Sequence, residues 1–595
     1  MCGIAGQFAL NGGKADADLL AAMGERLRHR GPDGEGTCFS GPIGLSHRRL
    51  AISDGWQPMA NEDGSLRIVF DGRIYNAPEL REDLRAPGHR FVTATDAGVV
   101  LHAYEEWGAD CLHRFNGMWA FAIWDERRRT LFCARDRPGI KPFYYTVAGG
   151  SFLFASEIKA LLAHPSVGRK PDDQMLLAFL AWGVADHTER TMYDGIFQIP
   201  PGHSIVVSEE GVGKPERYWS LAMSDASGGA DDEATAGRVR TLLTDAVRLR
   251  FPRDLPAGTC LSGGIDSSTI AFLVDDLLRA GSYEDRQKTF SVCFDDPRFD
   301  ESRYIDSVVA ATGAVSHRVT PDTEGLWEDI ERLLYVQDEP FASLSIYAQY
   351  SVMRLASREV RVVLDGQGAD EQLAGYIAYQ MPYIRGLLRE GQILPALREV
   401  LGGVRHHRSF FSWAIRQFLV RSERRELLRG DAPEVLRYAG SLDEVLEREI
   451  TATNLPLLLH WGDRNSMAFS IEARLPFLDH RLMEYLASLP LDQKIRDGIT
   501  KHVLRRAIRG LVPDIIRCRM DKMGFVTPEE AWMKDELSSQ VLDLFSTPAF
   551  SRRPYWDAEQ VLQNYQEFLD GKSEYSTEFW RIACTELWLR QFDGL

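Results

Sequence analysis

The stretch LSGGIDSS (Leu261–Ser268) combines residue types that could hold a phosphate and a cation together. Apolar residues before it predict a strand and the helical apolar spacing after it predicts a helix, so the stretch is expected to form a tight turn. Backbone amides and hydroxyls of such a turn can bind an anion. The expected contributors are Leu261, Ser262, Gly263, Gly264, Ser267 and Ser268. Asp266 inside this cradle favours a cation as well, and Mg²⁺ bridging phosphate oxygens is the natural choice.

The glycines alone would equally suit a Gly-Ser turn that only starts a helix. The Asp-Ser-Ser at this spacing favours a loop that holds pyrophosphate, as an AMP-forming ligase requires. The pattern is not a Walker A loop, because no Lys follows the glycines.

Cys2 is a second group with chemical potential. We expect Met1 to be removed, which leaves a thiol and a free α-amino group on one residue, and the amine can then act as a base for the thiol. A lone Cys at position 2 usually has no function, so this expectation depends on motifs further along. These motifs are RHRGPD (Arg28–Asp33), LSHRRLAISD (Leu45–Asp54), IVFDGRIYN (Ile68–Asn76) and TATDAGVVLHAYEEWG (Thr93–Gly108).

The length of 595 residues predicts at least two domains that position these groups. Alternating apolar residues predict layered strands in residues 2–208. Residues 209–236 are rich in Gly, Ser and acids and are expected to form a linker. Strands and helices alternate in residues 237–595, which predicts a parallel α/β sheet with ligands at the strand ends. The segment 380–460 is expected to be mostly helical.

Composition limits the partners and the compartment. The apolar fraction of 44% and the charged fraction of 26% are typical of a globular protein. A net charge of −17 argues against nucleic acid or an anionic membrane as partner. Eight scattered cysteines without CxxC pairs, and no apolar run near 18 residues, favour a reduced, cytoplasmic protein. We find no spacing typical of a structural metal site.

Further motifs extend this pattern over nearly the whole chain. They are FNGMWAFAIWD (Phe115–Asp125), RDRPGIKPFYY (Arg135–Tyr145), REVRVVLDGQGADEQLAGY (Arg358–Tyr376), GDRNSMAFSIEARLPFLDHRL (Gly462–Leu482) and the region Ile499–Trp532. In this order the motifs resemble the glutamine-hydrolysing asparagine synthetases, whose first domain is a class II amidotransferase with an amino-terminal nucleophile. The resemblance implies an αββα sandwich joined by an ammonia tunnel to a parallel-sheet ATP-pyrophosphatase domain with a helical carboxyl-terminal part, and, by analogy, a homodimer.

The resemblance also implies roles in the second domain. ATP and a carboxylate, either aspartate or an acid of a specialised pathway, would give an acyl-adenylate, with pyrophosphate held by the Gly-rich loop. Asp266 and Asp370 would bind Mg²⁺, and Lys522 would assist departure of pyrophosphate. The expected neighbours of adenine are Val292, Asp365 and Gly366, although plain strand packing would also explain them. Gln367 stands where many asparagine synthetases have Glu, so it can hold a nucleophile but cannot accept its proton.

The first domain departs from the family at its oxyanion hole. Arg49 would clamp the carboxylate of glutamine and Asp96 would bind its α-ammonium. The family's Asn-Gly-Glu is replaced by Asp71-Gly72-Arg73. An ionised Asp71 donates no hydrogen bond to an oxyanion, and the loss of one such donor typically costs about 10²–10³ in rate. Arg73 has the wrong sign to hold an ammonium group.

Three explanations remain open at this point. Asp71 and Arg73 could pair with each other and leave weak glutaminase activity. The glutaminase could be impaired, so that a ligase or cyclase uses free ammonia or another amine. The pocket could instead accept a different γ-glutamyl donor. A non-catalytic binding role is a further hypothesis, which the intact Gly-rich loop and Asp370 argue against.

Overall fold

The computed structural model describes residues 2–52, 55–91, 93, 95–223, 231–252, 255–281, 286–407, 427–433, 435, 440–521 and 527–591. Lys522 and residues 224–230 of the expected linker lie outside the described residues.

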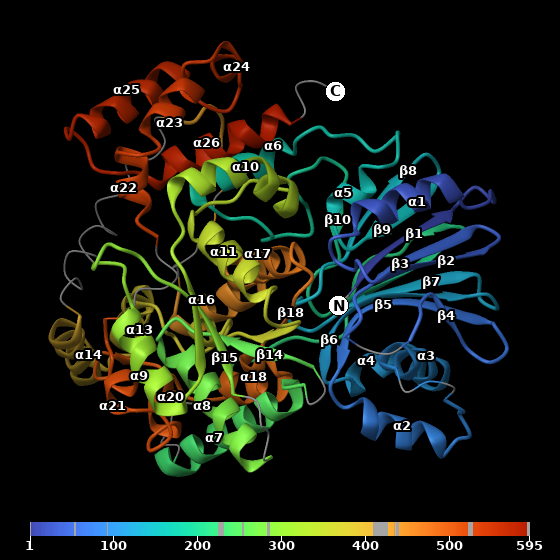
Figure 1. The fold of residues 1–595 in the computed structure, drawn as a ribbon, viewed down its shortest axis with the longest axis horizontal. Helices are drawn as coiled ribbons and strands as arrows, with labels where there is room; N and C mark the ends of the chain where they lie inside the picture. Colours follow the sequence, from blue (N-terminus) through green and yellow to red (C-terminus); the bar gives the residue numbers. More distant parts are fainter. Residues whose placement is uncertain are drawn as a thin grey trace.

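The amino-terminal half is a sandwich of two antiparallel sheets, at the right of Figure 1. The first sheet has the order β10 (Phe197–Gln198), β8 (Tyr144–Ala148), β9 (Ser151–Ala155), β1 (Gly3–Ala9), β3 (Ile43–Arg49) and β2 (Gly34–Ser40). The second has the order β12 (Gly211–Val212), β11 (His203–Ser208), β7 (Thr130–Arg135), β6 (Gly117–Asp125), β5 (Leu66–Ile74) and β4 (Met59–Ala60), with β13 (Glu216–Arg217) paired to β11.

Apolar side chains from both sheets fill the space between them, and helices cover the outer faces. Phe8 of β1 meets Trp124 of β6 edge-on at 5.1 Å between ring centroids. Helices α1 (Ala17–Arg26) and α5 (Ile158–Leu161) cover the first sheet, while α2 (Ala77–Arg85), α3 (Asp96–Trp107), η1 (Gly108–Asp110) and α4 (Cys111–Arg114) cover the second. The predicted αββα sandwich is therefore confirmed.

The carboxyl-terminal half contains a five-stranded parallel sheet, which confirms the predicted α/β architecture. Its order is β16 (Val315–Val319), β15 (Lys288–Val292), β14 (Ala257–Cys260), β17 (Val362–Leu364) and β18 (Glu472–Arg474). Successive strands are added on one side of β14 and then on the other. Ligands of such sheets bind where the strand order reverses, at the carboxyl ends of the strands.

Helices surround this sheet and form most of the remaining chain, including the described part of 380–460. Those near the sheet are α7 (Asp232–Arg250), α8 (Ile265–Ala280), α9 (Ser302–Thr312), α10 (Thr323–Gln337), α11 (Ser345–Ala356), α12 (Ala369–Gln372), η2 (Ile377–Tyr379), α13 (Gln380–Arg389), α14 (Ile393–His406), α16 (Leu442–Arg448), η3 (Glu449–Thr453), α17 (Leu455–Met467), η4 (Pro476–Leu478) and α18 (His480–Ala487). Further along are α19 (Leu491–Lys494), the hairpin β19 (Ile495–Arg496) and β20 (Ile499–Thr500), α20 (His502–Ala507), α21 (Asp514–Arg517), α22 (Glu529–Lys534), α23 (Ser538–Phe545), α24 (Pro548–Ser551), α25 (Ala558–Leu569) and α26 (Thr577–Arg590).

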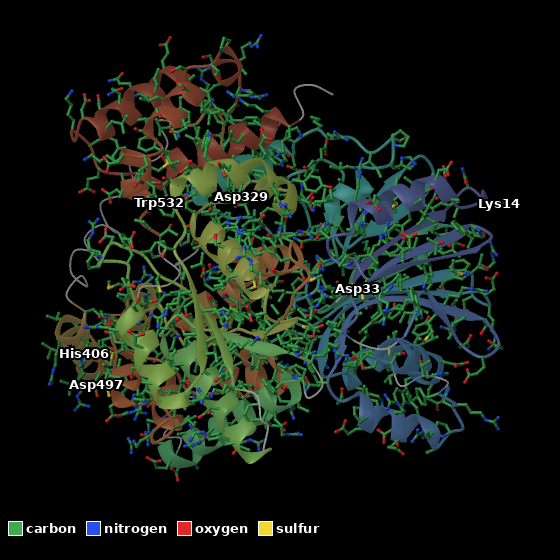
Figure 2. All side chains as sticks on the ribbon, in the orientation of Figure 1. Lys14, Asp33, Asp329, His406, Asp497 and Trp532 are labelled. Atoms are coloured by element: carbon green, nitrogen blue, oxygen red, sulfur yellow. The ribbon has the colours of Figure 1, made fainter. Side chains whose placement is uncertain are left out.

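The two halves share one hydrophobic core. The last helix, α26, packs beside α6 (Asp173–Trp182) of the amino-terminal half, at the top of Figure 1. Trp588 meets Tyr193 edge-on at 5.3 Å, and both side chains donate hydrogen bonds to the carbonyl of Asp338. In Figure 2, Asp33 of the RHRGPD motif lies toward the parallel-sheet half, whereas Lys14 lies at the far end of the sandwich.

Two candidate active sites joined by buried charges

A pocket of about 420 Å³, partly open to solvent, lies in the amino-terminal sandwich. It brings together four of the predicted residues, namely Cys2, Arg49, Gly72 and Asp96. Its other lining residues are His47, Leu50, Gly55, Gln57, Met59, Phe70, Thr95 and Ala97. Asp71 and Arg73 do not line it.

Cys2 precedes β1, a central strand of the first sheet, so its position is fixed by strands on both sides. Its backbone nitrogen donates a 2.9 Å hydrogen bond to Oδ1 of Asp71, and its carbonyl accepts one from Nε of Arg30. Burial raises the pKa of the Cys2 thiol, and the Asp71 carboxylate adds to the rise. The thiol therefore needs a base before it can attack. His47 beside it is held neutral, because burial lowers its pKa to about 3.

Asp71 is completely buried, and Arg30 compensates its charge. Nη2 of Arg30 lies 3.1 Å from Oδ2 of Asp71. The pairing of Asp71 with Arg73, one of the three explanations above, is therefore wrong. Gly72, the next residue, is required by packing, because a Cβ there would lie 2.1 Å from the carbonyl oxygen of Met118 on the neighbouring strand.

Arg73 instead connects the pocket to the second half of the molecule. Its Nη1 lies 3.4 Å from Oδ2 of Asp96, an oxygen that also accepts a hydrogen bond from the backbone of Ile74. Its Nε lies 3.8 Å from Glu472 of β18 in the parallel sheet. The positive charge that replaces the family's acid is thus held between two carboxylates.

Arg49 lies at the rim of the pocket. Its Nε donates to the carbonyl of Gly55, and its guanidinium lies over the indole of Trp56, 5.2 Å from the ring centroid. Trp56 is 62% exposed and is not a lining residue, so Arg49 lines the pocket while its guanidinium stacks on a surface side chain.

Buried ion pairs lead from Cys2 toward the parallel sheet. Besides Asp71, the Arg30 guanidinium binds Glu157 at 2.9 Å and Asp463 of α17 at 2.7 Å. Lys141 binds the same Asp463 at 2.6 Å. Burial alone would raise the pKa of Asp463, but the two cations hold it below its usual value. These charges join the two halves of the molecule directly beneath Cys2.

The Gly-rich loop lies in the second half where the strand order reverses, between β14 and α8. Gly263 has a left-handed φ of +69°, and a Cβ there would lie 2.7 Å from Cβ of Tyr304, so only glycine fits. The hydroxyls of Ser262 and Ser267 lie 3.1 Å apart in the turn. Ser268 is completely buried, whereas Ser262 is half-buried. Leu261 belongs to the core beneath the loop.

Asp266 and Asp370, more than a hundred positions apart, meet at one cation. Nζ of Lys501 lies 2.6 Å from a carboxylate oxygen of each. Lys501 was not predicted as a site residue, although it belongs to the motif region Ile499–Trp532. Lys501 has a left-handed φ of +54° immediately before α20, which turns its buried side chain into the site.

The segment after β17 packs directly on the Gly-rich loop. A Cβ on Gly366 would lie 3.1 Å from both Cβ of Asp266 and the backbone nitrogen of Ser267. Asp365 and Gln367 on either side line a second pocket of about 390 Å³. The other lining residues are Ile140, Lys141, Gln349, Met353, Leu458, Leu459, Gly462, Asp463, Ser466, Ala473 and Leu475. Lys141 and Asp463 in this set belong to the ion pairs that reach Cys2.

Two further predicted residues have less distinct positions. Val292, the last residue of β15, is half-buried and packs against core side chains, as expected if its role is strand packing. It lies at the same edge of the sheet as Asp365. Lys522 lies outside the described residues, but Arg519 donates a 3.2 Å hydrogen bond to the carbonyl of Gly263.

Glu371, next to Asp370, was not singled out in the sequence. Burial raises its pKa to about 7, and the neighbouring Asp370 adds to the rise. Tyr376 and Asn454 donate hydrogen bonds to its Oε1.

Comparison with known proteins agrees with this arrangement. The family described as glutamine amidotransferase domain matches residues 1–219, and the family described as asparagine synthase matches residues 238–590. Asparagine synthetase [glutamine-hydrolyzing] 3 of Bacillus subtilis is 32% identical, over 87% of this chain and 86% of its own length. Asparagine synthetase [glutamine-hydrolyzing] 1 of the same organism is 28% identical, over 99% and 96%. Amidase chry2 of Gibberella zeae is 29% identical, over 94% and 92%.

Among solved structures, glutamine phosphoribosylpyrophosphate amidotransferase of B. subtilis aligns with a TM-score of 0.28 and 15% identity, over 61% of this chain and 81% of that one. Within the described residues, every helix is too short or too polar to span a membrane. The match to asparagine synthase covers more than half of the chain, so the protein belongs to the asparagine synthase family, a carbon–nitrogen ligase in which a glutamine amidotransferase domain is joined to an ATP-dependent amide ligase.

Proposed function

We propose that the parallel-sheet half adenylates a carboxylate with ATP and then forms an amide on it, with nitrogen released at Cys2. The observation that carries this proposal is that two distant residues meet Asp266 of the Gly-rich loop. Asp370 shares the Lys501 ammonium with it, and Gly366 packs directly against it. The names of the two Bacillus relatives favour aspartate as the first acceptor to test. An acid of a specialised pathway, the other acceptor considered from the sequence, is the second.

Asp266 and Asp370 are the residues we assign to Mg²⁺. Their carboxylate oxygens converge on one point, now marked by the Lys501 ammonium, and hard oxygen donors are what Mg²⁺ prefers. Bound Mg²⁺ would neutralise charge that builds on the phosphates. Lys501, held by one oxygen of each carboxylate, would add a positive charge beside the ion, which favours departure of pyrophosphate whatever the position of Lys522.

We assign the amide groups of the Gly-rich loop, with Ser262 and Ser267, to the pyrophosphate. Asp365, Gly366 and Val292 are assigned to the neighbourhood of adenine, because they lie at the carboxyl ends of strands next to β14. Gln367 lines the second pocket, where its amide can orient the incoming amine without taking its proton.

The second pocket is the point where we expect ammonia to reach the acyl-adenylate. It lies between Gln367 and the Lys141–Asp463 pair, and most of its other side chains are apolar. An apolar lining excludes water, which would otherwise hydrolyse the activated acid. This supports the tunnel implied by the resemblance, with Arg30 at its amino-terminal end.

The amino-terminal site supports glutamine hydrolysis at a reduced rate. Arg49 and Asp96 are present to bind the carboxylate and ammonium of glutamine, and Gly72 offers a backbone donor. Asp71 cannot supply the missing donor to the oxyanion. If Met1 is removed, the Asp71 carboxylate would also favour the charged form of the Cys2 amine, which lowers the fraction of free amine that can take the thiol proton. This contact favours a second candidate function, a ligase that uses free ammonia or another amine.

Pyrophosphate release with ATP, Mg²⁺ and aspartate tests these alternatives when glutamine is compared with ammonium chloride. We expect turnover with both, with glutamine slower. Turnover with ammonium alone would establish the second candidate. Absence of turnover with both would exclude aspartate, and a panel of carboxylic acids would follow. The domain limits 2–208, 209–236 and 237–595 and a homodimer stay predictions, which limited proteolysis and light scattering can check.

A further inference from the structure

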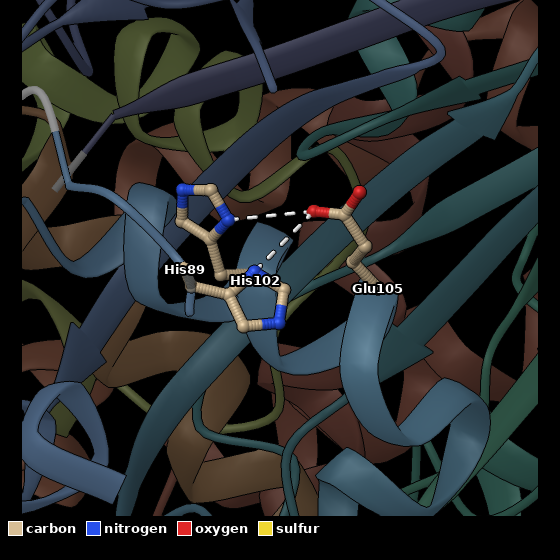
Figure 3. A group of neighbouring side chains, drawn as sticks. All are labelled: His89, His102 and Glu105. Atoms are coloured by element: carbon tan, nitrogen blue, oxygen red, sulfur yellow. Dashed lines mark ion pairs between the residues drawn. The ribbon is translucent and has the colours of Figure 1, made fainter. Parts of the chain in front are cut away.

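Two histidines and a glutamate converge on the sandwich, at the helical layer that covers the second sheet. His102 and Glu105 lie one turn apart on α3, and His89 lies in the loop after α2. Their ligand atoms all lie within 4.8 Å of one another. Figure 3 shows both imidazoles turned toward the same carboxylate oxygen of Glu105. The residues belong to neither pocket described above.

The distances match those between ligands of one metal ion. Nδ1 of His89 lies 3.7 Å from Oε2 of Glu105, and Nδ1 of His102 lies 3.4 Å from the same oxygen. Ligands bound tetrahedrally to Zn²⁺ at their usual bond lengths lie about 3.3–3.4 Å apart. A small contraction of the three side chains would therefore complete the coordination.

His89 and Glu105 also have outer partners that fix their orientation. Nε2 of His89 lies 3.0 Å from Glu106, whereas Nε2 of His102 faces Glu62 at 3.8 Å, beyond hydrogen-bond distance. Oε1 of Glu105 accepts a 3.1 Å hydrogen bond from Asn61, which leaves Oε2 toward the histidines. Carboxylates on the far nitrogen of a metal-bound His hold the ring and its tautomer in most metal sites.

His102 provides an independent sign of a ligand. The residue is only 6% exposed, and its buried Nδ1 makes no hydrogen bond to any residue that the structure describes. A buried polar atom of this kind usually has a partner, and a metal ion would supply one. The edge-on ring of Phe91, 4.7 Å away, holds the imidazole in place.

A second group of one histidine and two carboxylates lies equally close together but is not suited to bind a metal ion. Asp186, Glu339 and His460 also lie within 4.8 Å of one another. Nδ1 of His460 hydrogen-bonds to Asp186 at 2.9 Å, and Nε2 hydrogen-bonds to the carbonyl of Gln337 at 3.1 Å. Both nitrogens therefore act as donors, and no lone pair remains for a metal ion.

We propose that His89, His102 and Glu105 bind a divalent transition metal, with Zn²⁺ as the preferred ion. Two imidazoles and one carboxylate are a donor set typical of Zn²⁺, and the partly exposed edge of Glu105 leaves room for a water as fourth ligand. The ion would tie the loop after α2 to α3, whose first residue is Asp96 of the amino-terminal pocket. This proposal does not depend on the proposed function.

The test uses the full-length protein, stripped with chelator and free of ATP. Titration with Co²⁺ should give the visible spectrum of a tetrahedral site at about one ion per chain, and Zn²⁺ should displace it. His89→Ala and Glu105→Gln should each weaken binding at least tenfold. His164→Ala, in a turn of the same domain, is the matched control and should bind as wild type.

Both variants alter partly exposed side chains, so circular dichroism should show an intact fold. Zn²⁺ should also raise the melting temperature of the wild type and the control, but not of the two variants. Absence of Co²⁺ binding by the wild type, or undiminished binding by His89→Ala and Glu105→Gln, would overturn the assignment.

Discussion

The backbone nitrogen of Cys2 donates a 2.9 Å hydrogen bond to Oδ1 of Asp71, while Arg30 binds the other oxygen of the same carboxylate. Arg30 thus compensates the negative charge that Asp71 introduces at the position where the family has Asn. Under the proposed function the effect of Asp71 falls on the chemistry, because the acid occupies the place expected of an oxyanion donor and contacts the proposed nucleophile, Cys2.

Asp71→Asn should increase glutamine hydrolysis. An Asn whose oxygen accepts from Arg30 presents its amide hydrogens on the Cys2 side, which restores a donor there, so kcat/KM should rise between tenfold and about a thousandfold. Arg30 keeps Glu157 and Asp463 as partners, so the variant should fold. Glutamate release by the purified enzyme measures the effect. Asp83→Asn on the exposed face of α2 is the control, and an unchanged or lower rate in folded Asp71→Asn would contradict the expectation.

Lys501→Met should abolish most of the ligase reaction. The change removes the cation that lies 2.6 Å from both Asp266 and Asp370, so ATP-dependent pyrophosphate release should fall at least a hundredfold at saturating Mg²⁺. Lys288→Met, which loses a surface pair with Glu359 in the same sheet, should retain its rate. A loss of less than tenfold would show that Lys501 has only a structural role.

Gly366→Ala should raise the KM for ATP severalfold or more. The new methyl group would press on Asp266 and Ser267 at 3.1 Å and shift the Gly-rich loop. The cost in stability should be about 1–3 kcal/mol. Gly386→Ala in α13 meets no atom of the described residues within 4 Å and is the matched control, with wild-type kinetics expected. Equal kinetics of the two variants would show that the loop tolerates the added methyl group.

The contribution of Glu339 and His460 to stability should fall between pH 5 and pH 8. Burial raises the pKa of Glu339 to about 7, so the folded state holds a proton that the unfolded state has already lost. His460 acts in the same direction, because its pKa is raised by Asp186 against the effect of burial. The part of the free energy of unfolding that these two groups contribute therefore decreases as pH rises through this range.

Glu339→Gln isolates the contribution of the acid. It keeps an acceptor for the backbone of Met192 and removes the titration, so the decrease between pH 5 and pH 8 should shrink by about 2–3 kcal/mol. Denaturant titrations at the two pH values measure this, with the exposed Glu536→Gln as control. Identical pH dependence of wild type and Glu339→Gln would refute the expectation.

Much of the fold and part of the site could be predicted from the sequence. Periodicity and ordered motifs indicated both domains, and the resemblance assigned Cys2, Arg49, Gly72 and Asp96 to what is one pocket in the structure. Cys2, Arg49 and Gly72 lie in or next to strands, and Asp96 begins a helix. The apolar pattern of each element can be recognised from neighbouring positions in the sequence. Asp266 and Asp370 could be paired across a hundred residues, because both follow strands of one parallel sheet.

The missing parts depend on contacts between distant segments. Asp71 pairs with Arg30 rather than with Arg73, because the Asp71 and Arg30 side chains are both buried next to Cys2. The spacing of residues along the sequence does not indicate this burial. Lys501 reaches Asp266 only because of a left-handed residue before a short helix. His89 and the two α3 residues come from separate elements, and their separation of 13 and 16 positions matches no metal-binding motif.

The shared core between the halves has a consequence for how this enzyme can be handled and how it can evolve. Trp588 and Trp580 of the last helix pack with Tyr144, Leu176 and Tyr193 of the sandwich in one apolar cluster. Each half expressed alone would expose its side of this cluster to water, and aggregation is the expected result. The two reactions therefore take place in a single cooperative unit. A different domain could replace either half only if it also provided an apolar surface for this interface, at which α26 now packs on the sandwich.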